Sequence, residues 1–215
     1  MLLVLGLAAR TAAAQGADSS FFQRWGLDRL QFVALGGSVG RVDATQAEPA
    51  NIYQLYADYG ELARNWRVVF SVSYWESRLS ERTVQTFIDT LHKNIVDPAG
   101  DATILTSPIS LYDVTFSGSL RWQSSAAVTV RPYIGIGAAA HVINAEGRLI
   151  DGTFVERSLD AIAAGFFANG GVLIRPWGRV IFEAEARADL LSGFRSVQLQ
   201  AGAMYYFGRR RTTPQ

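Results

Sequence analysis

The sequence predicts an all-β protein that folds as one eight-stranded, antiparallel, up-and-down β-barrel. The first observation is a two-residue alternation of apolar and polar side chains that recurs in eight segments and is typical of strands with one apolar face. The second is that short and long connections alternate along the chain. The third is composition: 49% of the 215 residues are hydrophobic, yet beyond the N-terminus no apolar run reaches the roughly 18 residues of a membrane-spanning helix.

The first residues of the chain predict a targeting segment. Met1 to Ala9 reads MLLVLGLAA and is followed by an A-x-A pattern that ends at Ala14, as in a secretory signal peptide. We therefore expect a signal peptide over residues 1–14 and a periplasmic segment over residues 15–29. A short buried strand or helix is the alternative, since no positively charged residue precedes the apolar core.

The first four predicted strands fill the region before residue 125. The alternation is weak in the first two strands and clear in the next two, where Trp66, Phe70 and Tyr74 face away from Arg67 and Ser71. The four predicted ranges are Leu30 to Arg41, Tyr53 to Glu61, Trp66 to Tyr74, and Tyr112 to Trp122.

The last four predicted strands include the strongest pattern in the chain. In the seventh, Glu183, Glu185 and Arg187 share one face and apolar residues share the other; a helix would scatter these charges around its circumference. The sixth strand is weaker. The four ranges are Val128 to Val142, Ile162 to Arg175, Val180 to Leu190, and Val197 to Phe207.

The connections indicate which ends of the strands lie together. Short connections (Leu62 to Asn65, Gln123 to Ala127, and Pro176 to Arg179) alternate with longer ones (Val42 to Ile52, Ser77 to Pro108, Ile143 to Ala161, and the shorter Leu191 to Ser196). Bacterial outer-membrane barrels carry tight periplasmic turns on one rim and long extracellular loops on the other. The even strand count brings both ends of the barrel to the short-turn side.

Alternation alone also fits a soluble, lipocalin-type barrel with an apolar lumen. Side-chain size favours the opposite orientation, because the polar faces are rich in small residues such as Ser117, Gly135 and Gly171, which fit a narrow eight-stranded interior. The apolar faces carry Trp66 and Trp122 near strand ends, the positions of a membrane aromatic belt. We therefore predict a transmembrane barrel with the polar face inside.

In this orientation ten charged residues are predicted to form a polar network in the lumen. Enclosed charges must be paired to be tolerated. Arg67, Arg121, Arg131 and Arg175 lie close to short turns and should form a basic ring at the periplasmic end. The network is either a structural plug or a narrow ion path gated by Arg–Glu pairs. Its members are Asp58, Arg67, Asp113, Arg121, Arg131, Arg175, Glu183, Glu185, Arg187 and Asp189.

Two further motifs carry a family resemblance. With the run Arg131-Pro132-Tyr133-Ile134-Gly135-Ile136-Gly137 and a last strand ending Tyr205-Tyr206-Phe207, the chain resembles the small eight-stranded outer-membrane barrels, the OmpA-like, OmpW-like and opacity-type porin group. The resemblance implies an outer-membrane location, a barrel over residues 30–208, and contacts with outer-membrane lipid and lipopolysaccharide. It also implies that Tyr205 and Phe207 are read by the barrel-assembly machinery. The basic tail, residues 209–215, departs from the family pattern.

Composition and motifs limit the function classes. A net charge of +1 is too small to indicate nucleic-acid binding. Without Cys and with only two His, far apart in sequence, we expect no metal and no cofactor. We expect a monomeric, non-enzymatic barrel in a structural or surface-interaction role, or else a narrow channel for small or apolar solutes.

A lipid A-modifying enzyme is the remaining alternative. His141 lies near the outer end of the fifth strand, where Glu146, Asp189 and Ser192 could share its rim, but the H-x-S spacing expected of a deacylase is absent. The long second loop also predicts a helix that Ser80 would cap. This helix would act either as a lid or as packing against the rim.

Overall fold

The computed structural model describes residues 30–45, 47–83, 85–86, 109–124, 129–146, 161–175, 178–191 and 194–207. The predicted signal peptide, the segment 15–29 and the basic tail lie outside these residues. No helix in the described ranges is long and apolar enough to cross a membrane.

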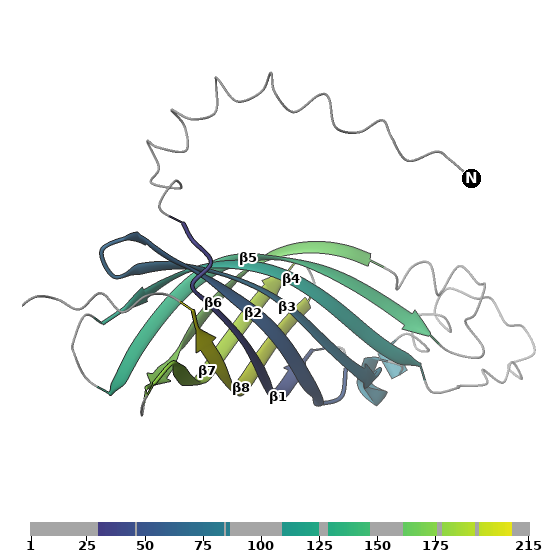
Figure 1. Ribbon diagram of the computed structural model, residues 1–215. Helices are drawn as coiled ribbons and strands as arrows, with labels where there is room; N and C mark the ends of the chain where they lie inside the picture. The colour runs from purple at the N-terminus through teal and green to yellow at the C-terminus, as the bar shows by residue number, and fades with distance from the viewer. Residues whose placement is uncertain are drawn as a thin grey trace, which may run out of the picture.

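The described chain forms a closed barrel in which every strand pairs antiparallel with its neighbours in sequence, and β1 pairs with β8 to close the ring (Figure 1). This confirms the predicted eight-stranded, up-and-down topology. The strands are β1 (Ala34–Ala44), β2 (Ala50–Ala63), β3 (Trp66–Arg78), β4 (Ser110–Gln123), β5 (Val130–Glu146), β6 (Ala161–Ile174), β7 (Val180–Leu191) and β8 (Phe194–Tyr206).

The first strand starts later than predicted. β1 begins at Ala34 rather than Leu30, although the backbone N–H groups of Gln31 and Val33 still donate to carbonyls of β2 at 2.9 and 2.8 Å. The neighbouring edge of β2 is irregular, with register shifts after Asp58 and a φ of 83° at Gly60. A residue without Cβ suits that positive φ. The ladder therefore continues here as single hydrogen bonds rather than as regular strand.

One predicted long connection, Val42 to Ile52, is short, and the connection already predicted to be shorter, Leu191 to Ser196, is shorter still. Most strands extend further toward the loop end than the alternation indicated, which leaves only residues 45–49 between β1 and β2 and residues 192–193 between β7 and β8. The connections 79–109 and 147–160 are long. The predicted length is thus wrong for the connection between β1 and β2, because backbone pairing continues after the apolar alternation ends. We call this rim the loop end, and the rim at 64–65, 124–129 and 175–179 the short-turn end.

The outer surface of the barrel is apolar. Ile162, Phe166 and Leu55 are 83%, 76% and 68% exposed, respectively, and they belong to a contiguous face that an aqueous surface would not tolerate. Trp66, Trp122 and Tyr205 lie on this face near the short-turn end, as an interfacial aromatic belt does. This confirms the predicted orientation, with the apolar face toward lipid.

Glycines make room for large side chains inside the narrow barrel. A Cβ placed on Gly137 would lie 2.6 Å from Cε1 of Phe167, and one on Gly36 would lie 2.6 Å from Cζ of Tyr56. Both separations are well inside van der Waals contact, so the rings could not keep their places. Small residues on the inward face therefore leave space in the lumen, and aromatic rings from neighbouring strands occupy it.

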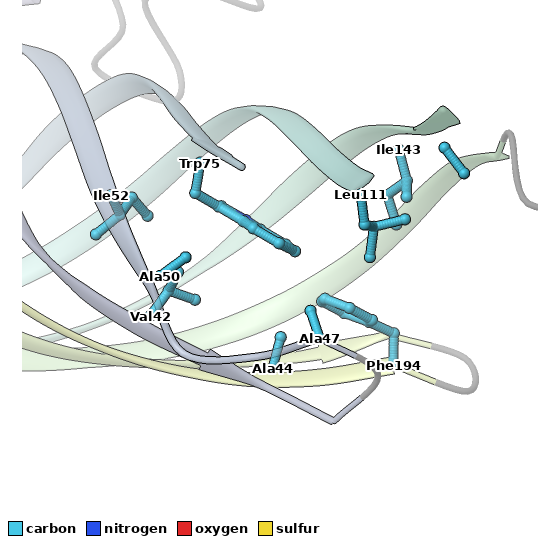
Figure 2. Packing of buried hydrophobic residues seen from close by; sticks show 10 residues of the cluster. Val42, Ala44, Ala47, Ala50, Ile52, Trp75, Leu111, Ile143 and Phe194 are labelled. Carbon is cyan, nitrogen blue, oxygen red and sulfur yellow. The ribbon is translucent and has the colours of Figure 1, made fainter. Parts of the chain in front are cut away.

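An apolar cluster fills the lumen at the loop end, as Figure 2 shows from close by. The rings of Trp75 and Phe194 stack at 6.3 Å with an interplanar angle of 11°, and Ile52 is completely buried. This cluster was not predicted from the sequence, because eight of its ten members fall within predicted loops. We call it the apolar plug: Val42, Ala44, Ala47, Ala50, Ile52, Trp75, Leu111, Ile143, Ala145 and Phe194.

The predicted helix in the second loop is present at its start. Residues 81–83 and 85–86 are helical, and the backbone N–H of Thr83 donates to Oγ of Ser80 at 3.3 Å. Ser80 therefore caps the helix as predicted. The apolar stripe that would decide between a lid and rim packing lies outside the described residues.

Candidate functional site

The structure places all ten predicted charged residues on the inward side of the barrel. Arg67, Arg131 and Arg175 are half-buried near the short-turn end. The other seven are at most 7% exposed: Asp58, Asp113, Arg121, Glu183, Glu185, Arg187 and Asp189. They divide into two buried clusters and one group at the short-turn mouth.

The first cluster is built around Arg121. Its Nη1 lies 2.7 Å from Oε1 of Glu183 and its Nη2 lies 2.7 Å from Oε2 of Glu185. The Tyr133 hydroxyl hydrogen-bonds to both carboxylates, and Asn169 Nδ2 donates to Glu185 at 2.9 Å. We call these five residues the Arg121 cluster. A guanidinium can pair with two carboxylates in this way because its donors form a rigid planar fork.

Register explains how the Arg121 cluster forms. Arg121 on β4 pairs with Gly135 on β5, and a Cβ at that position would lie 3.0 Å from Cγ of Arg121. The glycine therefore leaves a passage for the long side chain toward β7. Since β4 and β7 are not neighbours in the barrel, the cluster bridges the lumen rather than one strand pair. Arg121 consequently does not belong to a basic ring at the mouth, which corrects that prediction.

The second cluster lies closer to the loop end and centres on His141. Oδ2 of Asp113 lies 2.7 Å from His141 Nδ1 and accepts hydrogen bonds from Thr115 Oγ1 at 2.9 Å and Trp75 Nε1 at 3.2 Å. His141 Nε2 lies 3.9 Å from Oδ1 of Asp189. The Trp75 bond connects this His141 cluster directly to the apolar plug.

Arg187 anchors the β7 side of the His141 cluster. Its guanidinium donates to Asp189 at 2.6–3.1 Å and to Ser117 Oγ at 3.0 Å. Its Cζ lies 3.7 Å from the ring centroid of Phe167, a cation–π geometry. Gln198 Nε2 donates to Asp189 at 2.9 Å. The cluster therefore joins β4, β5, β7 and β8 by polar contacts.

The mouth group surrounds the short-turn opening. Arg67 donates to Oδ2 of Asp58 through Nε and Nη2, both at 2.8 Å, and the Gly60 N–H donates to Oδ1 at 2.7 Å. The guanidinium of Arg175 lies over the Tyr206 ring, with Cζ 5.2 Å from the centroid. Of the four arginines in the predicted basic ring, three lie at the mouth: Arg67, Arg131 and Arg175. They line a cavity of about 190 Å³.

His141 is not a rim residue. It is 1% exposed, beneath the apolar plug, and Glu146, expected beside it, instead accepts a hydrogen bond from Tyr112 on the outer surface at 2.7 Å. Of its other expected neighbours, Asp189 lies within 3.9 Å of the ring and Ser192 is outside the described residues. The structure thus encloses His141 where a lipid at the rim does not reach it. Among the described residues, no group of three or more His, Asp or Glu could hold a metal ion.

Several residues of these clusters were not predicted from the sequence to belong to the polar network. Tyr133, His141, Asn169 and Gln198 are all buried and hydrogen-bonded to the charged residues. Each occupies the same alternating position as the charged residues on its strand or on a neighbouring strand. The alternation could have indicated that these side chains face inward. It could not indicate which charged residue each of them contacts.

A closed barrel with an apolar exterior and a polar, filled interior defines a small transmembrane β-barrel of the outer-membrane type. The neisserial surface protein NspA has the same fold, with a TM-score of 0.52 and 15% identity over 81% of this chain and 97% of its own. OprG from Pseudomonas aeruginosa gives a TM-score of 0.51 and 10% identity over 84% of this chain and 98% of its own.

No protein-family model and no curated protein matches the chain. At these low identities, the likeness to solved structures shows the fold alone. The transmembrane location follows from that fold together with the apolar outer face, since closed barrels are the only β-structures that satisfy their backbone hydrogen bonds in lipid. The protein is therefore an integral barrel of the outer membrane.

Proposed function

We propose that the protein is a structural or surface-interaction barrel whose lumen is closed to solutes. The observation that carries this proposal is the Arg121 cluster. Arg121, Glu183 and Glu185 each have side chains that are 5% exposed, and their contacts bridge β4 and β7 across the barrel. A solute passing through would have to separate buried charges, and leaving such charges unpaired costs several kcal/mol.

The apolar plug supports the same proposal from the other end. Trp75, Ile52 and Phe194 occupy the lumen at the loop end with at most 6% exposure. An apolar constriction has no groups to replace the hydration shell of an ion. Two barriers of different chemistry thus lie in series along the barrel axis.

The surface role is assigned to the two long connections, 79–109 and 147–160, which leave the barrel at one end. A rigid scaffold that carries long loops is a common arrangement for recognition. The partners we propose for the barrel itself are outer-membrane lipid and lipopolysaccharide along the apolar face, with the chain acting as a monomer. Tyr205, exposed at the end of β8 and 5.1 Å from the Phe207 ring, is proposed with Phe207 as the assembly signal.

Planar-bilayer conductance tests the closed lumen. The purified barrel is expected to give no stable conductance steps, and the double substitution Glu183→Gln with Glu185→Gln should leave it closed, because the plug and Tyr133 remain. Glu61→Gln, at a side chain that is 62% exposed at the mouth, is the matched control. Discrete steps that grow in the double variant but not in the control would instead show a channel gated by Arg–Glu pairs.

A further inference from the structure

The mouth cavity is a polar recess with an apolar floor. Its volume is about 190 Å³, and it lies at the short-turn end among Arg67, Arg131 and Arg175. Leu173, Ile181 and Met204 contribute to its lining and belong to a buried apolar cluster. A ligand group seated here would thus be partly shielded from water, which strengthens its attraction to charge.

The acidic residues that line the mouth do not compensate the charge of Arg131. Both oxygens of Asp58 are already occupied, by the Gly60 N–H and by Arg67. The mostly exposed Glu61 side chain approaches Arg67 Nη1 only at 3.9 Å. Within the described residues, the side chain of Arg131 makes no hydrogen bond or ion pair, although the residue is half-buried.

Register brings Arg131 and Arg175 together. Arg131 pairs with Leu173 across β5 and β6, and the backbone N–H of Arg175 donates to the carbonyl of Thr129 at 3.0 Å. The two arginines are therefore diagonal neighbours on the inward face, within reach of one another for long side chains. Like charges in such positions repel, and an anion between them removes the repulsion while forming charge-assisted hydrogen bonds.

We propose that the mouth cavity binds an oxyanion, a carboxylate or phosphate group of a small molecule in the periplasm, between Arg131 and Arg175. The planar guanidinium of Arg131 forms a bidentate contact with the anion, and Arg175, lying over the Tyr206 ring, contributes the second positive charge. The cavity lies at the short-turn end, and binding there does not require a pathway through the lumen, so the proposal is independent of whether the barrel conducts.

Nuclear magnetic resonance of the arginine side-chain Nε–Hε groups tests the site in the full barrel folded in detergent. Inorganic phosphate and, separately, N-acetyl-alanine as a carboxylate probe are titrated at constant ionic strength. We expect saturable shifts of the Arg131 and Arg175 signals. Arg131→Gln should weaken binding about tenfold or more, measured on the Arg175 signal. The control Arg41→Gln, at an exposed outer residue hydrogen-bonded to Asn51, should leave it unchanged.

The two probes distinguish the sources of the anion. Saturation by phosphate alone assigns the site to phosphorylated solutes, and saturation by N-acetyl-alanine alone assigns it to peptide carboxylates; either result supports an oxyanion site. The proposal would be overturned if neither probe gave saturable shifts, or if Arg131→Gln and Arg41→Gln weakened anion binding equally. Should Arg131→Gln fail to give a heat-modifiable folded band, Arg131→Lys keeps the charge but loses the fork, and unchanged affinity there would contradict the bidentate contact.

Discussion

The two ends of the lumen are closed by different means. At the loop end, the apolar plug seals the barrel over the His141 cluster. Trp75 connects the two, because its ring packs in the plug and its indole N–H donates to Asp113. At the short-turn end, the Arg121 cluster lies beneath a cavity lined by Arg67, Arg131 and Arg175. One small barrel thus combines closure by apolar burial with closure by ion pairing, and the cavity with its three arginines lies at the ion-paired end.

The largest expected effect comes from breaking the ion-paired closure. Arg121→Met leaves Glu183 and Glu185 buried without their shared cation, and should lower the free energy of unfolding by about 3–5 kcal/mol. Reversible urea unfolding of the barrel in lipid vesicles measures this. Arg41→Gln on the outer surface is the control. A loss below about 1 kcal/mol would mean that the cluster contributes little to closure at this end.

Removing volume from the apolar closure should have a similar or somewhat smaller effect. Ile52→Ala, at a completely buried position of the plug, is expected to cost about 2–5 kcal/mol by creating a cavity. Leu55→Ala on the same strand is the matched control, since Leu55 is 68% exposed toward lipid. The same unfolding assay compares them. Equal losses at the two positions would show that the plug is not tightly packed.

The smallest effect is expected at the mouth. Arg67→Gln removes the pair with Asp58, whose second oxygen keeps its Gly60 bond. Because Arg67 lies at the mouth while Asp58 is buried, with side chains 14% and 7% exposed, the loss should lie between that of an exposed pair and that of a fully buried pair, at about 1–2 kcal/mol, and salt should reduce it only partly. Measuring unfolding at low and high ionic strength against Glu61→Gln checks it. A loss as large as that of Arg121→Met would remove the distinction between mouth and interior.

Much of the architecture was readable from local pattern. A strand places successive side chains on opposite faces, so the alternation at Glu183, Glu185 and Arg187 is a property of one segment and needs no partner. The same two-residue period predicted that all ten charged residues face inward and that the bulky apolar residues face outward. It failed at strand ends such as Val42 and Phe194, because a backbone ladder continues as long as a neighbouring strand offers hydrogen bonds, whatever the side chains.

The number of strands, their order and the face of each strand that meets lipid thus follow from the sequence. The folded barrel was needed to show that Arg121 pairs with Glu183 and Glu185, that His141 lies against Asp113, and that apolar side chains seal the loop end. The physical reason is that faces follow from the two-residue period of a single strand. Contacts across the lumen depend on the register of all eight strands around the closed ring, and no single segment encodes that register.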